Sequence, residues 1–157
     1  MRRLLLAALA SGLATLVLAP AADALIQVDR GIAGARLGNT VAQVRAALGP
    51  PARVRNGTND FGRFTVFRYR GGITVSFQGR RRVSAVTTTG PGDRTGRGVG
   101  VGSTEAAVKA RVPGVRCETI AGTRSCHTGR FAAGRRVTDF LLRSGRVRRV
   151  TVGFVLD

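Results

Sequence analysis

The sequence of 157 residues contains few of the side chains on which enzymes depend. It has one histidine, one tyrosine, no tryptophan and only eight acidic residues. Carboxylate pairs that act as general acid and base need a matched spacing. The acids beyond residue 24 are scattered singly, at Asp29, Asp60, Asp93, Glu105, Glu118, Asp139 and Asp157. The composition therefore predicts a protein that is not an enzyme and that carries no cofactor.

One short run, Ser125-Cys126-His127, places nucleophile-type residues beside the histidine. Adjacent residues on a strand point to opposite faces, so the run makes a poor catalytic dyad. His127 has no companion histidine and no cluster of other ligands, so the sequence predicts no metal site. A hydrolase or redox protein stays open as an alternative of a different class.

Lysine is almost absent, yet the chain is strongly basic. Lys109 is the only lysine, and arginine supplies nearly all of the formal net charge of +18. Such a charge favours association with an anionic cell-wall polymer or lipid surface, although a GC-rich genome would also produce an arginine-rich composition. Nucleic acid is disfavoured as a partner, because few aromatic residues are present to stack on bases. The candidate residues for anionic surfaces are Arg80, Arg81, Arg82, Arg135, Arg136, Arg146, Arg148 and Arg149.

The amino terminus has the pattern of a secretory signal peptide. Arg2 and Arg3 precede an apolar run from 4 to 18, and Ala22-Asp23-Ala24 offers a small-x-small cleavage site. The run is shorter than the roughly 20 residues that span a bilayer. No cysteine stands at the cleavage point to carry a lipid anchor. We expect a secreted, periplasmic or cell-envelope protein.

A stretch early in the chain recurs later. Leu37–Pro51 has the pattern of a glycine turn, a capped short helix and a Gly-Pro stop, and Val101–Lys109 repeats it 64 residues further on. The same offset pairs Thr87 with Thr151, and a constant register is typical of duplication. The sequence therefore predicts an α+β fold of two tandem repeats. Each repeat is expected to be a short helical segment packed on an antiparallel β-meander of three to four strands.

The predicted repeats give the expected organisation of the chain. Residues 1–24 form the cleaved signal peptide, 25–89 the first α+β repeat and 99–157 the second. Between them, 90–98 carries four glycines, a proline and no apolar side chain, which is typical of a linker.

Local signals place the elements within each repeat. Thr40 and Gln43 have the spacing of a helix capping box. The segment 73–78 alternates apolar and polar residues, as expected of a strand with one buried face. Asn56-Gly57 predicts a turn, because both residues tolerate a positive φ.

The two cysteines predict a disulfide across a hairpin. A two-residue turn at Ala121-Gly122 would set Cys117 opposite Cys126 as a non-hydrogen-bonded pair. The Cα atoms of such a pair lie about 4.5 Å apart, within reach of a disulfide. Export permits the oxidation. A redox pair is the alternative.

The run from Leu37 to Pro51 resembles the start of the SmpA/OmlA (BamE-like) family of small envelope proteins. The tandem duplication is similar to the arrangement of β-lactamase inhibitor proteins. These resemblances imply binding to an envelope or extracellular protein. We therefore expect a secreted, non-catalytic binding or structural module of the cell envelope, with a sheet face as its contact surface. The alternative is a binder of anionic cell-wall polymer or lipid through the arginines.

Overall fold

The structure is a computed structural model that describes residues 25–79 and 81–156. The predicted signal peptide, Arg80 and Asp157 lie outside the described residues. No described helix is long and apolar enough to cross a membrane. The elements in chain order are β1 (Ile26–Gln27), β2 (Gly31–Ile32), β3 (Ala35–Arg36), α1 (Val41–Leu48), β4 (Arg53–Asn59), β5 (Gly62–Arg68), β6 (Ile73–Gln78), β7 (Arg82–Thr88), α2 (Glu105–Arg111), β8 (Arg116–Ile120), β9 (Thr123–His127), β10 (Arg136–Arg143) and β11 (Arg146–Phe154).

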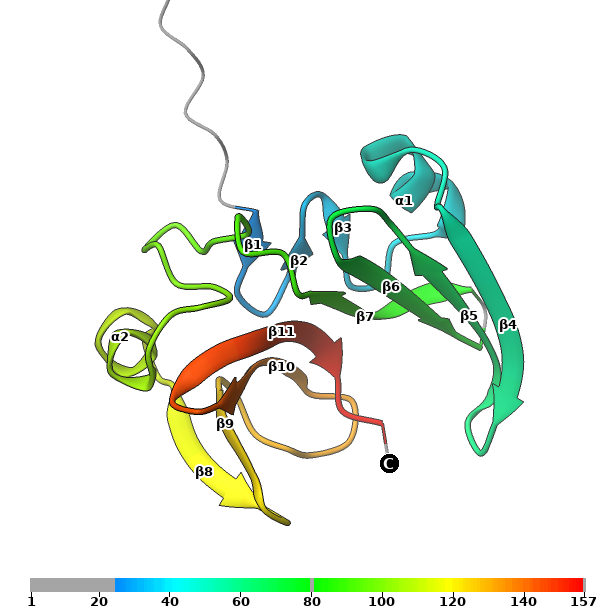
Figure 1. The fold of residues 1–157 in the computed structure, drawn as a ribbon. Helices are drawn as coiled ribbons and strands as arrows, with labels where there is room; N and C mark the ends of the chain where they lie inside the picture. Colours follow the sequence, from blue (N-terminus) through cyan, green and yellow to red (C-terminus); the bar gives the residue numbers. More distant parts are fainter. Residues whose placement is uncertain (1–24, 80, 157) are drawn as a thin grey trace, which may run out of the picture.

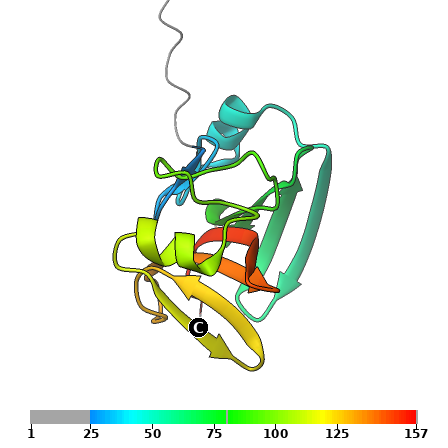
Figure 2. The same cartoon turned by 60° about the vertical axis from the view of Figure 1, so that its left-hand side comes forward.

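The largest unit of the described fold is a single antiparallel sheet of eight strands, in the order β4-β5-β6-β7-β11-β10-β9-β8. The strands β1, β2 and β3 form a small second sheet. The large sheet is strongly curved, and α1, the small sheet and α2 all lie on its convex side (Figure 1). The rotated view in Figure 2 shows the same division into two layers.

The predicted α+β class is wrong, because the domain is mostly β. The two helices have only 8 and 7 residues, too short to be stable in water without packing. The strands β4–β7 form one meander and β8–β11 form the other. These two meanders are not separate helix-covered units, because β7 pairs with β11 and joins them into one sheet. This pairing sets Thr87 opposite Thr151. Local alternation of apolar and polar residues does not reveal such a distant pairing.

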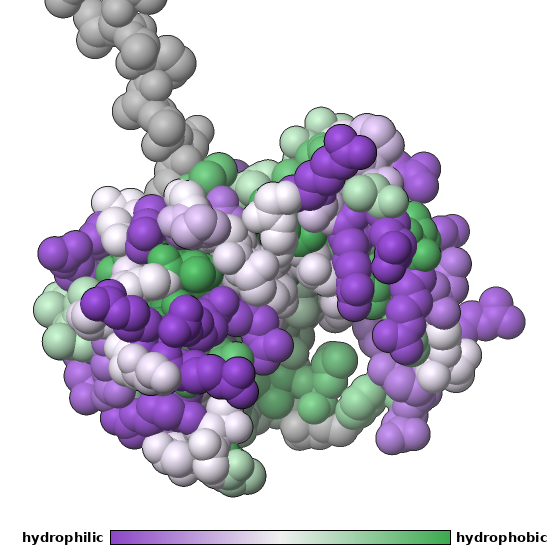
Figure 3. Space-filling model, viewed as in Figure 1, coloured by the Kyte–Doolittle hydropathy of each residue, from purple (hydrophilic) through white to green (hydrophobic). Residues whose placement is uncertain are grey.

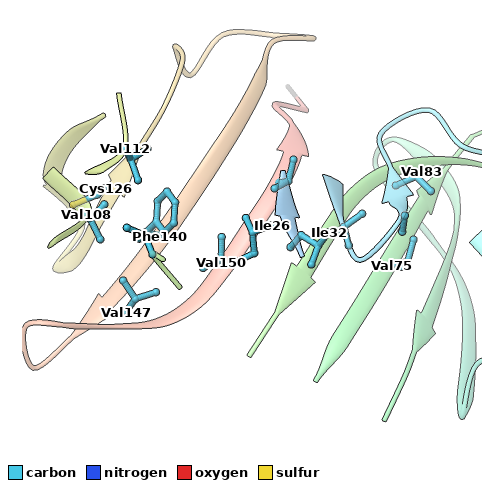
Figure 4. Close-up of a cluster of buried hydrophobic side chains, with 14 of the residues drawn as sticks. Ile26, Ile32, Val75, Val83, Val108, Val112, Cys126, Phe140, Val147 and Val150 are labelled. Carbon is cyan, nitrogen blue, oxygen red and sulfur yellow. The ribbon is translucent and has the colours of Figure 1, made fainter. Parts of the chain in front are cut away.

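The core lies between the two layers and is built mainly of valine, isoleucine and phenylalanine. Val86 and Val150 from the centre of the large sheet pack in one cluster with Ile32 of β2 and with Val108 of α2. Figure 4 shows Val75 and Val83 from one half of the sheet and Phe140 and Val150 from the other half pointing into one shared layer. Burial of this face explains why the domain holds together with so few helical residues.

The predicted helix caps are confirmed. The Thr40 side chain accepts a hydrogen bond from the backbone N–H of Gln43, whose side chain in turn accepts from the backbone N–H of Thr40. Thr104, 64 residues later, caps α2 by accepting a hydrogen bond from the backbone N–H of Ala107, but Ala107 has no side chain to return the bond. The backbone N–H of Gly38 donates to Val83 O, and that of Gly102 donates to Val147 O. Backbone pairing before the helices therefore recurs at the same offset.

The turn predicted at Asn56-Gly57 is wrong, because both residues lie inside β4. The Thr65 hydroxyl donates to the Asn56 side-chain oxygen at 2.8 Å across the strand pair. Gly57 leaves room for the ring of Phe64, which a Cβ at that position would strike. Asn56 and Gly57 are therefore explained by cross-strand packing rather than by a positive φ.

The segment 90–98, predicted as a linker, packs against the small sheet. The backbone N–H of Ile26 donates to Arg94 O at 3.0 Å. Asp93 is buried and accepts a hydrogen bond from the hydroxyl of Thr88. The segment is therefore anchored at both β1 and β7.

Candidate functional site

The concave face of the large sheet carries one continuous row of opposed residues, one from each strand. Directly opposed residues in an antiparallel sheet point to the same side. We call this set the central row and the face that carries it the open face. In spatial order the central row is Arg53, Arg68, Thr74, Thr87, Thr151, Asp139, His127 and Arg116.

The floor of the open face consists of small side chains. The hydroxyl oxygens of Thr87 and Thr151 lie 3.1 Å apart at the centre of the row. The adjacent row contributes Ser76, Ala85 and Gly153, which oppose one another on β6, β7 and β11. Small side chains leave the centre hollow, and Figure 3 shows a depression between the lobe of α2 and the lobe of β4.

Arginines dominate the open face on β4 and β5. Arg53, Arg55 and Arg68 are exposed, and their strand positions put them on one face. The guanidinium of Arg55 lies 5.6 Å from the centre of the Phe64 ring, a cation–π distance. Within the described part of the chain, none of these arginines forms an ion pair with a carboxylate. This half of the face is therefore cationic.

A polar cluster lies on the other half, on β8, β9 and β10. His127 is buried, and its Nε2 lies 2.8 Å from Glu118 Oε1. The exposed ring of Phe131 packs on the imidazole with ring centres 4.3 Å apart. Asp139, opposite His127, has a buried carboxylate oxygen without a hydrogen-bond partner. Burial raises the pKa of Asp139, while a hydrogen bond from Ser125 and the charge of Arg149 act against the rise.

The geometry of this cluster does not form a nucleophile–base pair. Ser125 and His127 share the open face, whereas Cys126 between them points into the core. Both nitrogens of the His127 ring already face oxygens, Nε2 that of Glu118 and Nδ1 the backbone oxygen of Thr128 at 3.4 Å. No ring nitrogen is therefore directed at Ser125. The cluster holds the histidine against the tilted ring of Phe131.

The predicted disulfide between Cys117 and Cys126 is present, and the hairpin has the predicted register. The Cα atoms are 3.9 Å apart. Glu105 of α2 lies close to both sulfurs, but sulfurs bonded to each other offer no thiolate to a metal ion. The Glu105 carboxylate instead pairs with Arg124 and Lys109, whose hydrogen bonds lower its pKa to about 2. A structural disulfide is typical of secreted and envelope proteins, in agreement with the export that the sequence predicts.

Of the eight arginines singled out from the sequence, the seven that the structure describes do not gather on one surface. Arg136 opposes Phe154 at the end of β11, whereas Arg146 and Arg148 lie near its start. The Arg82 guanidinium donates to Gly38 O at 3.2 Å, and the Arg146 guanidinium donates to Gly102 O at 3.0 Å.

The remaining candidates occupy separate places. Arg81 is in the turn before β7, and Arg135 directly precedes β10. Arg149 opposes Leu141 on the open face. Among the described arginines singled out from the sequence, Arg149 is the one whose charge acts on Asp139. It lies two residues along β11 from Thr151, which opposes Asp139.

Sequence reasoning missed the arginines of β4 and β5 as site residues. Arg53 and Arg55 alternate with Val54, a pattern that would have shown a cationic strand face. Because the sequence predicts a turn at Asn56-Gly57, it does not indicate the full length of β4 or the pairing of Arg53 with Arg68 on β5.

No family model matches the chain, and no curated protein matches it. The solved structures that are similar to it include three with a TM-score of 0.49 each. A DUF4309 family protein from Bacillus subtilis is 19% identical, over 78% of this chain and 84% of that one. A cysteine-rich secretory protein from Staphylococcus aureus is 12% identical, and an extracellular SCP-domain protein from Bacillus anthracis is 11% identical. Each of these two matches covers 75% of this chain and 44% of the other.

These similarities are distant. At such identities and TM-scores they carry no argument about what this chain binds or does. None of the three is a SmpA/OmlA protein or a β-lactamase inhibitor protein.

Proposed function

We propose that the protein is an exported, non-catalytic binding module of the cell envelope that contacts a partner protein through the open face. The observation that carries this proposal is the contrast between the two faces of the large sheet. One face is covered by α1, α2 and the small sheet, whereas Thr74, Ser76, Ala85, Thr87 and Thr151 on the other face stay partly exposed. A broad sheet face with an uncharged floor and charged groups toward its sides has the arrangement of a protein contact surface, whose centre is depleted of charge.

The size of the open face fits a protein rather than a small molecule. Eight strands at a spacing of about 4.8 Å give a width of about 34 Å along the sheet. The floor of the depression is made of small side chains, and the charged groups lie toward the two sides. Small-molecule sites more often enclose their ligand and direct a few polar groups at it.

The resemblance of Leu37–Pro51 to the SmpA/OmlA family supports the same class of role. The predicted signal peptide and the disulfide of Cys117 with Cys126 support the compartment. The proposed partner is accordingly an envelope or extracellular protein.

Binding of an anionic cell-wall polymer or lipid surface is the second proposal, favoured by the net charge of +18. Salt distinguishes the two, since 0.5 M salt shortens the screening length to about 4 Å. Attachment that depends on a polyanion is lost under these conditions. A protein interface with a packed floor survives them.

Site-specific photo-cross-linking in the producing cells tests the first proposal. A cross-linking amino acid replaces Thr87 at the centre of the open face or, as a matched control, Ala46 on the exposed side of α1. We expect discrete protein adducts from position 87 and none from position 46. Equal adduct patterns at the two positions, or adducts from position 46 alone, would contradict the proposed contact surface.

A further inference from the structure

We propose that the open face recognises a partner surface on which the charges are separated. A cluster of carboxylates docks on the β4–β5 half, and a cationic or hydrogen-bond-donating group docks on the β8–β10 half. This inference rests on the proposed function and names the chemistry of the partner. It also separates a protein partner from a uniform polyanion.

The β4–β5 half offers three guanidinium groups with no competing acid. Arg53 and Arg68 oppose each other across the strand pair, and Arg55 lies two residues along β4 on the same face. Arginine binds carboxylates through two parallel hydrogen bonds. Three exposed arginines that lack carboxylate partners among the described residues are therefore suited to a cluster of aspartate or glutamate side chains.

The β8–β10 half has a different charge pattern. Glu118 is 46% exposed at its side chain, and Asp139 holds the oxygen without a partner. Arg116 of β8 and Arg149 of the neighbouring β11 match these two carboxylates in number, so the charges around the polar cluster are mixed rather than uniformly positive. An acidic segment of a partner would gain little electrostatic attraction on this half, because it would lie against the carboxylates of Glu118 and Asp139. A lysine, an arginine or a backbone N–H from the partner fits Glu118 instead.

A neutral floor separates the two halves. Thr74, Thr87 and Thr151 lie between them on the central row. The facing edges of the two halves, β5 and β10, are four strand spacings apart, or about 19 Å along the sheet at 4.8 Å each. This distance exceeds the Debye length of about 8 Å at physiological ionic strength. The halves therefore act as independent electrostatic sites, and a partner must satisfy each of them separately.

A uniform polyanion does not match this arrangement. A teichoic-acid-like or nucleic-acid chain laid across the face would bring negative charge onto Glu118 and Asp139 as well as onto the arginines. Like charges in contact are unfavourable. A folded protein or an extended segment with separated charges avoids that contact.

Three labelled peptides test the charge pattern directly at low salt. The block peptide has four glutamates, a Gly-Ser-Gly-Ser spacer and four lysines. Its 12 residues span about 40 Å when extended. The second peptide has the same composition with glutamate and lysine alternating, and the third replaces every lysine by glutamate. Exposed ion pairs are weak individually, so three of them predict roughly tenfold tighter binding of the block peptide than of the alternating one.

Charge-reversal variants connect that preference to the open face. Arg55→Glu with Arg68→Glu is expected to abolish the preference for the block peptide. Arg97→Glu with Arg111→Glu changes the net charge equally at exposed positions next to β1 and α2, away from the open face, and is expected to preserve it. Equal losses in both variants would overturn the inference in favour of net charge alone. An all-glutamate peptide that binds at least as tightly as the block peptide would also overturn it.

The cross-linked adduct from Thr87 separates this inference from the proposed function. If the adduct forms but is unaffected by Arg55→Glu with Arg68→Glu, the contact surface stands and the charge pattern is wrong. If no adduct forms at position 87, the proposed function itself fails. If the adduct is lost with the open-face pair and kept with the control pair, both are supported.

Discussion

The hydroxyl oxygens of Thr87 and Thr151 lie 3.1 Å apart, although the two residues are 64 positions apart in the sequence. They oppose each other where β7 meets β11, the one pairing that joins the two meanders. The same contact lies at the centre of the open face. Joining of the two meanders and formation of the broad open face are therefore consequences of a single strand pairing.

We predict that the hydroxyl groups of Thr87 and Thr151 are energetically coupled. Either change, Thr87→Val or Thr151→Val, leaves one hydroxyl without its partner and lowers the free energy of unfolding by about 1 kcal/mol. The double variant should lose less than the two single losses together, by roughly 0.2–1 kcal/mol. Urea denaturation of the four proteins measures this difference. Thr74→Val, on the same row, should show no coupling to Thr151→Val, and strict additivity for Thr87 and Thr151 would show that the contact contributes nothing.

The disulfide is predicted to contribute substantially to stability. Cys117 and Cys126 close a loop with a sequence separation of 9, for which the chain-entropy account gives about 2–3 kcal/mol. Reduction of the unaltered protein should lower the free energy of unfolding by that amount without introducing a cavity in the core. Denaturation with and without reductant measures the change. An unchanged midpoint would contradict a stabilising role for the disulfide.

Stability at low pH is predicted to depend on Glu105. Hydrogen bonds from Arg124 and Lys109 lower its folded-state pKa from 4.5 to about 2. A carboxylate with a lowered pKa stabilises the fold at any pH above its unfolded-state pKa. This stabilisation is lost as the pH falls from about 4.5 toward 2. In Glu105→Gln this part of the pH dependence should be missing, whereas Lys109→Gln should keep most of it through Arg124. Parallel stability curves for Glu105→Gln and the unaltered protein would exclude the ion pair as the cause.

Asp139 is predicted to behave in the opposite sense. Burial raises its pKa above the ordinary value of 3.8. The stability that the protonated carboxyl contributes is therefore fully present below pH 3.8 and is lost as the pH rises through the folded-state pKa. Asp139→Asn should therefore be more stable than the unaltered protein at pH 7 and lose this advantage near pH 3. Thermal unfolding at the two pH values measures the crossover. A variant that is less stable at pH 7 would show that the ionised carboxylate has a favourable partner.

The sequence was most informative where structure is set by neighbouring residues. Thr40 and Gln43 are three positions apart, so the capping box could be read directly. Cys117 and Cys126 face each other across a two-residue turn, so their register followed from counting. In both cases short-range geometry leaves few alternatives.

The fold class and the open face depend on distant pairings that no local pattern records. The contact of β7 with β11 joins segments more than 60 residues apart. Asn56-Gly57 has the local character of a turn, yet the neighbouring Phe64 and Thr65 hold both residues inside β4. Tertiary packing prevailed over local preference there, and the cationic half of the open face was missed as a result.

The most direct test of the account is whether blocking the open face removes the partner. Ser76→Arg places a long side chain on the floor, and Ala46→Arg adds the same group to the exposed side of α1. Each change is combined with the photo-cross-linker at Thr87, and the adduct yield is measured in the producing cells. We predict that Ser76→Arg abolishes the adduct while Ala46→Arg leaves it intact. An adduct that persists at full yield with Ser76→Arg would contradict binding through the open face.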